Sequence, residues 1–391
     1  MSKTVSPKAA SHATAGTTPT TQAKRPPVDA ILGSYLRTGE RPYIHICWML
    51  HNHCNHRCSY CDKSNWGGDH PWPKIDDAFR FFETVLRHYN DRRITVSFSG
   101  GEPTLWPDLV KLVMWLRERD ITVGMTSNGT KGPEFFQTIS PMLQWLSLSF
   151  HPQFTEPNRF TETVIAAQST PHLTVRLMMP PERRLWNRSY AFGEKLKTLT
   201  SFLRPVIAEY VPIVDGFASP NARPIRYEDD QTQRFEQASF QLGPSSPSPK
   251  GTPIADVEGG IIGSPIRFIP LDPNQLITRN ENNFFGWRCE IGREQLFIDS
   301  MGRILRAGCG VGGLVGHITD SEFFFPTSSV RCDKVFCHCL TDVLAYPHAV
   351  VSREFKYLAK RYLPPRVYYT ARDGFRMMKQ FITRLKSRAS S

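Results

Sequence analysis

The chain has 391 residues, with 48 Lys and Arg, 36 Asp and Glu, nine cysteines and a formal net charge of +12. This length is enough for one large domain and a smaller one, and a core of this size needs no disulfide staples. No apolar run approaches the roughly 20 residues that cross a bilayer, so we expect a cytoplasmic protein. In that reducing compartment, clustered cysteines indicate metal binding or redox chemistry more often than disulfides.

The N-terminal segment has the composition of a disordered tail. Its first 27 residues contain no Asp or Glu and many Ser, Thr, Ala and Pro. Such a stretch cannot bury enough apolar surface to fold, so we predict disorder over residues 1–40. No secretory apolar segment is visible there.

Between residues 43 and 214, short apolar runs rich in Val, Ile and Phe alternate with longer amphipathic stretches. This alternation is typical of strand–helix units around a parallel sheet. It predicts an α/β fold with a partial (β/α)6 TIM-like barrel over residues 41–214. The six strands are expected at 44–49, 94–97, 122–126, 146–150, 173–178 and 206–213. Helices are expected at 75–89, 109–119, 133–143, 159–168 and 190–202.

The pattern changes after residue 214. Residues 215–285 are irregular and include a Pro- and Ser-rich run, which predicts a linker or surface insertion. A smaller cysteine-rich α+β domain is expected at 286–345, with a hairpin over 295–305 that turns at 299–302.

The last segment, 346–391, is basic and helical in pattern. Packing against its own barrel is the commoner outcome for such a segment, and contact with a membrane surface or a protein partner is the alternative. No added nucleic-acid module or aromatic platform accompanies the positive charge, so no nucleic-acid partner is expected.

Three cysteines, Cys54, Cys58 and Cys61, follow the first predicted strand with the spacing Cys-x3-Cys-x2-Cys. Three thiolates on one loop can bind three irons of a four-iron cluster and leave the fourth iron open. A structural zinc site would need a fourth protein ligand. Loops at the carboxyl ends of barrel strands are where active sites gather, which favours the iron–sulfur interpretation. Nearby histidines could complete the zinc alternative: His51, His53 or His56.

Three motifs in this order resemble the radical S-adenosylmethionine (radical SAM) superfamily, over roughly residues 43–214. They are the cysteine loop with Tyr60 before its last cysteine, Ser99-Gly-Gly-Glu-Pro-Thr104 past the second strand, and Thr126-Ser-Asn-Gly129 ending the third. The resemblance implies a [4Fe-4S] cluster that reductively cleaves S-adenosylmethionine to a 5′-deoxyadenosyl radical. That radical would abstract hydrogen from a substrate, while the protein orients the reacting pair.

The resemblance also implies contacts to the cofactor. The backbone of Tyr60 would lie near the adenine. Gly100 and Gly101 would allow close backbone approach to the methionyl amino group, and Glu102 would offer it a carboxylate. The other expected contacts are Ser127, Asn128, Ser149 and Arg176.

Three residues near these motifs have ordinary explanations. Arg176 is equally well explained as a strand-surface arginine. His151 precedes Pro152 and is more often a turn histidine than a base, so it is given no role. Cys47 lies within the first strand, where a small apolar residue is expected.

Five further cysteines lie within about fifty residues of the C-terminal domain, and zinc is the simplest explanation of such a group. However, Trp287, Cys289, Gly292, Gly302 and Cys309 resemble the auxiliary-cluster domains of the superfamily, known as SPASM and, in shortened form, twitch. The pattern departs from a full SPASM domain, because six residues separate Gly302 from Cys309 and a Cys-x4-Cys-x-Cys segment replaces the final block.

We therefore predict one auxiliary iron–sulfur cluster from the resemblance. Its expected ligands are Cys289, Cys309, Cys337 and Cys339. Cys332 is treated as the spare, which could instead ligate or give a hydrogen atom to a substrate radical.

The substrate is expected to be a small molecule or a peptide. Only about forty residues precede the first strand, so a peptide would need a separate recognition partner. The expected electron donor is a protein such as flavodoxin or ferredoxin. The alternative class is a non-catalytic metal-binding or iron–sulfur electron-transfer protein, which would have no need of the methionine-binding motif around Glu102.

Overall fold

The structure is a computed structural model. It describes residues 43–215, 223, 225–235, 239–242, 260–263, 267–270, 277, 282–286, 288–337 and 345–346. The predicted disordered tail, the Pro- and Ser-rich run and the basic segment beyond residue 346 lie outside the described residues.

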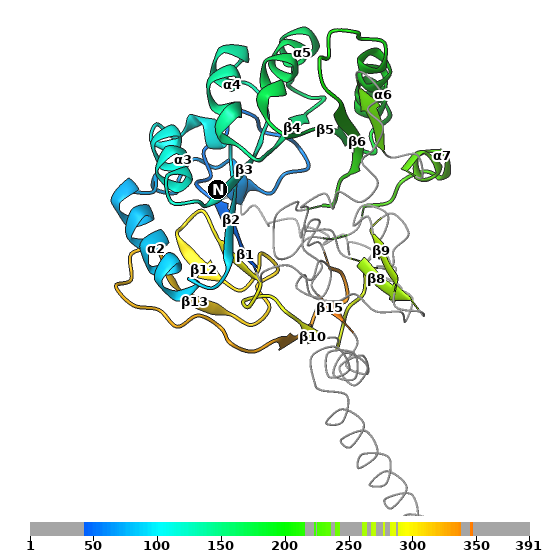
Figure 1. Cartoon of the computed structure of the whole chain (residues 1–391). Helices are drawn as coiled ribbons and strands as arrows, with labels where there is room; N and C mark the ends of the chain where they lie inside the picture. The colour runs from blue at the N-terminus through cyan, green and yellow to red at the C-terminus, as the bar shows by residue number, and fades with distance from the viewer. Residues whose placement is uncertain are drawn as a thin grey trace, which may run out of the picture.

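Six parallel strands form the centre of one curved sheet, and helices alternate with them along its outer side (Figure 1). The strands are β1 (Tyr43–Met49), β2 (Arg93–Ser99), β3 (Thr122–Ser127), β4 (Trp145–Phe150), β5 (His172–Met179) and β6 (Val206–Pro212). The α-helices between them are α2 (Ile75–His88), α3 (Leu109–Arg117), α4 (Pro133–Ile139), α5 (Pro157–Ala166) and α6 (Arg183–Lys197). Short 3-10 turns are η1 (Lys63–Asn65), η2 (Pro103–Leu105), η3 (Ser140–Met142) and η4 (Ala167–Ser169).

The main core lies between the outer face of the sheet and the helices. Side chains at alternate strand positions point into it, and Trp48 of β1 is fully buried there. Its ring centroid lies 6.3 Å from that of Phe81 and 6.0 Å from that of Phe82, both on α2. Helix α2 buries apolar residues at helical spacing, which explains why this stretch is a helix. They are Ala78, Phe81, Phe82 and Val85.

The inner face of the sheet is more polar. The ring of His45 on β1 lies 2.8 Å from Thr95 Oγ1 and 3.1 Å from Ser97 Oγ, both on β2. Trp145 covers Gly124 of β3, where an added Cβ would lie 1.8 Å from the indole. These side chains fill the interior toward the amino ends of the strands, so the opposite, carboxyl edge is the side on which a reaction site is expected.

The C-terminal hairpin joins the barrel sheet. Strand β11 (Gln295–Ile298) pairs in parallel with β1, and β12 (Arg303–Leu305) and β13 (Leu314–His317) continue outward from it. The full order is β13-β12-β11-β1-β2-β3-β4-β5-β6-β7. The hairpin turn lies where the sequence predicts it, since Gly302 N–H donates to Asp299 O at 2.9 Å and Gly302 has φ 82.

Short elements complete the described structure. They are α7 (Asp229–Arg234), β7 (Ser239–Leu242), β8 (Gly260–Gly263), β9 (Arg267–Pro270), β10 (Arg288–Cys289), β14 (Val330–Arg331) and β15 (Ala345–Tyr346). Strand β7 pairs antiparallel with β6. Strands β14, β10 and β15 form a small separate sheet, and β8 pairs with β9.

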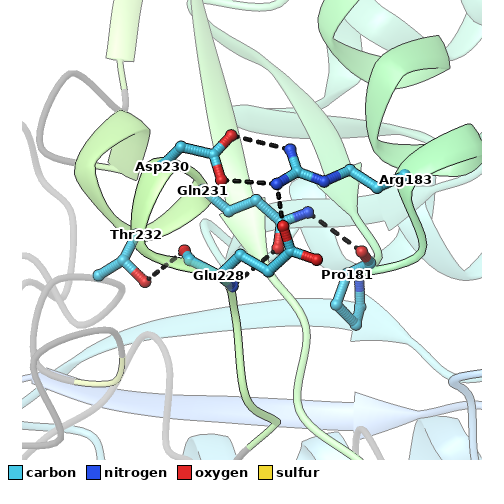
Figure 2. A network of polar contacts seen from close by, with 6 residues as sticks. All are labelled: Pro181, Arg183, Glu228, Asp230, Gln231 and Thr232. Atoms are coloured by element: carbon cyan, nitrogen blue, oxygen red, sulfur yellow. Dashed lines mark hydrogen bonds and ion pairs between the residues drawn. The ribbon is translucent and has the colours of Figure 1, made fainter.

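A polar network ties α7 to the connection between β5 and α6 (Figure 2). Arg183, the first residue of α6, forms ion pairs with Glu228 and, at 2.6 Å, with Asp230. Gln231 Nε2 donates to Pro181 O at 3.0 Å. The sequence predicts this helix only from residue 190, because Arg183 and Arg184 open it with charges where an apolar period is the usual signal.

The predicted α/β class with a parallel, barrel-like sheet is confirmed. Among the described residues, none of the helices has the length and apolar character that crossing a bilayer requires.

Candidate active site

The three motif cysteines lie on the connection that leaves the carboxyl end of β1. Cys58 is buried, and Cys54 and Cys61 are half-buried. Cys61 N–H donates to Cys58 O at 3.1 Å, which turns the loop and brings the Cys58 and Cys61 thiols into hydrogen-bond contact. Cys54 is close enough to interact electrostatically with Cys58. The structure thus gathers the three thiols in one place.

The environment of the thiols gives them different protonation preferences. Hydrogen bonds from Cys61, His151 and His56 lower the pKa of Cys58. Burial raises the pKa of Cys54 to about 12, and the shared hydrogen bond with Cys58 raises that of Cys61 above its usual range. Cys58 is therefore the thiol with the most thiolate character, which is the form that binds metal.

The Gly-Gly-Glu loop after β2 packs directly on the backbone of the cysteine loop. Gly101 N–H donates to His51 O and Glu102 N–H donates to His53 O, both at 2.8 Å. A Cβ at Gly100 would lie 2.6 Å from His51 O, and one at Gly101 would lie 2.0 Å from His53 O. Both glycines are therefore required for close contact between these two loops. This requirement is separate from the predicted approach of a cofactor.

The Glu102 carboxylate is buried and accepts four hydrogen bonds. Oε1 accepts from Thr104 N at 3.1 Å, Thr104 Oγ1 at 2.7 Å and Ser127 Oγ at 2.7 Å. Oε2 accepts from Asn128 N at 2.7 Å. The carboxylate therefore holds the Ser127-Asn128 segment at the end of β3 in place by hydrogen bonds. Its contact with a methionyl amine remains a prediction.

Asn128 joins the third motif to the first. Its Nδ2 donates to Asn55 Oδ1 at 2.8 Å and lies 4.0 Å from Cys54 Sγ. Its Oδ1 accepts from Thr130 N at 3.0 Å and Thr130 Oγ1 at 2.6 Å. The side chains of all three motifs consequently form one connected network at the carboxyl edge of β1, β2 and β3.

His151, to which the sequence assigns no role, lies within this site. Its Nδ1 is 2.6 Å from Tyr60 Oη and 3.4 Å from Cys58 Sγ. The ligand atoms of His56, Cys58 and His151 all lie within 4.8 Å of one another, a spacing that can hold a metal ion. The sequence signal for this role is that His151 directly follows β4, the strand that contributes Ser149.

The cysteine loop also reaches across the mouth of the barrel. Cys58 and Tyr60 are buried in a small apolar cluster with residues from the carboxyl ends of β5 and β6. This packing holds the loop against the carboxyl ends of β5 and β6, the edge at which active sites of such barrels gather. The partners are Met178, Val211 and Ile213.

The two predicted contacts on later strands lie on the inner face of the sheet. Ser149 on β4 is buried and pairs in register with Arg176 on β5. Arg176 Nε lies 3.7 Å from Glu209 Oε2 on β6, so the arginine is paired within the protein. Their contacts to a cofactor stay predictions.

The second group of cysteines forms its own buried cluster. Cys289, Cys309 and Cys332 pack around Phe284, with Cys337 against them. Burial raises the pKa of Cys289 and that of Cys332, the latter to about 12, and the neighbouring cysteines add to both effects. The structure thus brings Cys332 into the group. Cys339 and Trp287 lie outside the described residues.

A family model matches the region that carries these motifs. Residues 48–152 match the family model described as the Radical SAM superfamily. Similar solved structures include Streptococcus suis SuiB bound to S-adenosylmethionine, with a TM-score of 0.43 and 12% identity, covering 72% of this chain and 62% of SuiB. Native anSMEcpe with bound AdoMet has a TM-score of 0.43 and 13% identity, covering 84% of this chain and 100% of that one. None of the curated proteins compared with the sequence matches it.

A third similar structure is BtrN in complex with AdoMet and 2-DOIA, with a TM-score of 0.35 and 11% identity, covering 71% of this chain and 79% of that chain. The chain spans about 62% of the length of SuiB.

The matched residues contain the cysteine loop and both loops that are hydrogen-bonded to it, so the part of the chain that matches the Radical SAM superfamily model, residues 48–152, is the part that carries the three motifs.

Proposed function

We propose that this chain reductively cleaves S-adenosylmethionine and uses the resulting radical to take a hydrogen atom from a small-molecule or peptide substrate. The observation that carries the proposal is the single network joining Cys54, Glu102 and Asn128 at the carboxyl edge of the sheet. When bound, a [4Fe-4S] cluster supplies the electron that splits S-adenosylmethionine into methionine and the 5′-deoxyadenosyl radical.

The donor set fits such a cluster. Three thiols from one loop suit three irons, and an open iron needs a fourth position without a protein ligand. The ligands that would hold the cluster are Cys54, Cys58 and Cys61.

The remaining residues position and enclose the reactants. The N–H groups of Gly101 and Glu102 donate to the loop after β1, and the Glu102 carboxylate accepts from Asn128 N–H after β3, so these loops are held in a fixed relation. Ser127, Asn128, Ser149 and Arg176 line the same edge and inner face, where polar groups of S-adenosylmethionine would be oriented. Packing of Tyr60 against the ends of β5 and β6 excludes water from the loop.

We also propose that the C-terminal cysteines hold an auxiliary iron–sulfur cluster of SPASM or twitch type. Their mutual burial supports Cys289, Cys309, Cys332 and Cys337 as ligands, because four thiolates complete a cluster without an open iron. The sequence favours Cys339 as the fourth ligand and Cys332 as the spare; Cys339 lies outside the described residues, so its role stays a prediction.

A non-catalytic metal-binding protein is the second candidate. The trio of His56, Cys58 and His151 favours it, because Zn–N and Zn–S bonds of about 2.0 to 2.3 Å bring ligand atoms this close together. A single zinc ion on this trio would leave Cys54 and Cys61 without a role.

Anaerobic reconstitution distinguishes the candidates. We expect bound iron and sulfide, and 5′-deoxyadenosine after dithionite reduction with S-adenosylmethionine. The product should disappear in Cys58→Ala and persist in Cys47→Ala, a matched thiol on β1 outside the motif. Iron-free protein that carries stoichiometric zinc and makes no 5′-deoxyadenosine would overturn the proposal.

A further inference from the structure

A short segment that follows β6 in the chain lies against the carboxyl ends of β5 and β6. The chain leaves β6 at Pro212 and returns at residue 223, where the backbones of Arg223 and Asp215 exchange two hydrogen bonds of 2.9 and 3.0 Å. It then runs into α7, and we call residues 225–235 the strap. The polar network of Figure 2 joins the strap to the connection between β5 and α6.

Tyr227 of the strap holds the ends of both strands. The last paired residues of β5 and β6 are Met179 and Pro212. Ile213 N–H donates to the Tyr227 hydroxyl at 2.6 Å, and this hydroxyl donates to Met179 O at 2.9 Å. Ile213 is fully buried, so its N–H needs a partner within the protein. One phenol group therefore satisfies backbone groups at the ends of two neighbouring strands.

The ring of Tyr227 is held by two aromatic neighbours. Its centroid lies 6.0 Å from that of Trp186 on α6 and 5.0 Å from that of Phe235 at the end of the strap. Both neighbouring side chains are buried. A phenylalanine at this position would keep these ring contacts, so removal of the hydroxyl tests the hydrogen bonds separately from the packing.

The strand ends that the strap holds are the surface on which the cysteine loop packs. Cys58 and Tyr60 are buried in one cluster with residues from both strand ends, and Ile213 is among them. Ile225 of the strap packs against the same cluster. The strap therefore supports the packing of the cysteine loop in two ways, through its own apolar side chain and through the strand ends.

We propose that Tyr227 and Ile225 are positioning residues for the cysteine loop. The inference rests on the proposed function, in which the loop must present its cluster to S-adenosylmethionine at one fixed place. In the described part of the chain no hydrogen bond joins either residue to a cysteine, so both act through the packing around Cys58. Loss of either contact should let the loop open locally while the rest of the barrel stays folded.

The test measures how fast each cysteine of the full chain reacts with iodoacetamide before reconstitution, by mass spectrometry of its peptides. Tyr227→Phe leaves a buried backbone N–H without its partner, and Ile225→Ala removes a contact of the cluster. We expect each change to raise the alkylation rate of Cys58 by about tenfold. The rates of Cys289 and Cys332, which are buried in the C-terminal cysteine cluster, should stay within about twofold of wild type.

Two control variants are matched to these changes. Tyr89→Phe removes a buried hydroxyl that has no hydrogen-bond partner among the described residues, and Leu203→Ala shortens a side chain that is 85% exposed. Both should leave the alkylation rate of Cys58 within about twofold of wild type. After reconstitution, Tyr227→Phe should form 5′-deoxyadenosine with dithionite about tenfold more slowly than Tyr89→Phe, because the loop holds its cluster less precisely.

Each outcome decides one question. A wild-type alkylation rate of Cys58 in both strap variants, or a wild-type rate of 5′-deoxyadenosine formation in Tyr227→Phe, would overturn the positioning role. An increase shared by Cys289 and Cys332 would also overturn it, because it would indicate a general loss of stability. If Tyr227→Phe failed to fold, Ile225→Ala would decide, since it breaks no hydrogen bond. Failure of the wild type to make 5′-deoxyadenosine would instead remove the proposed function, which alkylation of the metal-free chain does not test.

Discussion

The hydroxyl of Ser127 donates to the buried carboxylate of Glu102 at 2.7 Å, although Ser127 ends β3 and Glu102 lies on the connection after β2. This contact makes the end of β3 dependent on the loop after β2. The same carboxylate also accepts from the next residue, Asn128, whose side chain reaches the cysteine loop.

Replacing Glu102 by Gln should therefore destabilise the protein. One carboxylate oxygen becomes an amide group that cannot accept, so buried donors at Ser127 or Asn128 lose their partner. The free energy of unfolding should fall by about 2 kcal/mol, measured by urea denaturation. Glu134→Gln, at an exposed position in α4, should change it by less than about 0.5 kcal/mol. An unchanged denaturation midpoint for Glu102→Gln would contradict this role.

Replacing Gly101 by Ala should separate the loop after β2 from the cysteine loop. Its Cβ would lie 2.0 Å from His53 O, a backbone atom that cannot move without displacing the cysteines. We expect a loss of about 2 to 3 kcal/mol in unfolding free energy and a decrease in iron bound after reconstitution. Gly310→Ala is the control, because Gly310 has φ 74 and nothing within 4 Å of an added Cβ, so only about 1 kcal/mol of backbone strain is expected. Wild-type iron content in Gly101→Ala would refute the prediction.

His51 should make stability depend on pH. Burial, and to a lesser degree His53, lowers its pKa from 6.5 to about 4. Between these values the unfolded chain binds a proton that the folded protein does not, so stability is full above pH 6.5 and declines as the pH falls toward 4. The contribution is about 3 kcal/mol.

The comparison is with His51→Gln, whose amide oxygen can still accept from His53 N–H as His51 Nδ1 does at 3.2 Å. Unfolding free energies measured from pH 7 to 4 should decline less steeply in this variant. Parallel curves for the two proteins would show that His51 does not carry the effect.

Cys332→Ser should remove the iron of the auxiliary cluster and leave that of the cysteine loop. The reason is the burial of Cys332 together with Cys289 and Cys309. Iron analysis and electron paramagnetic resonance after reconstitution provide the measurement, and Cys47→Ser is the matched control with full iron content. Full iron in Cys332→Ser would return Cys332 to the role of a spare.

The sequence predicts the local elements of the barrel well, because strand alternation and helical spacing are properties of a few consecutive residues. The turn at Asp299 and Gly302 is likewise a local signal. The parallel pairing of β11 with β1 is not, since it joins residues such as Cys47 and Phe297 that lie far apart in the chain. The periodicity of a strand's sequence does not specify which other strand pairs with it.

The candidate site, too, could be predicted from the sequence only in part. The three motifs predict the cysteine loop, the glycines and the Ser-Asn segment as one site, and the structure brings them together. The bracing role of Glu102 depends on which donors the fold places around it. The contact of His151 with Tyr60 depends on the loop crossing the barrel mouth. Spacing alone also could not show that Cys332 lies among the other cysteines, because the segment carrying it returns through a separate small sheet.

The parallel contact between β1 and β11 has a consequence for biosynthesis. During translation β1 leaves the ribosome early, and its second neighbour is complete only when Ile298 has been made. Until then one side of β1 presents unpaired backbone groups, which is a template for aggregation. A nascent chain that stalls before this residue therefore carries the cysteine loop on a strand with one unpaired edge.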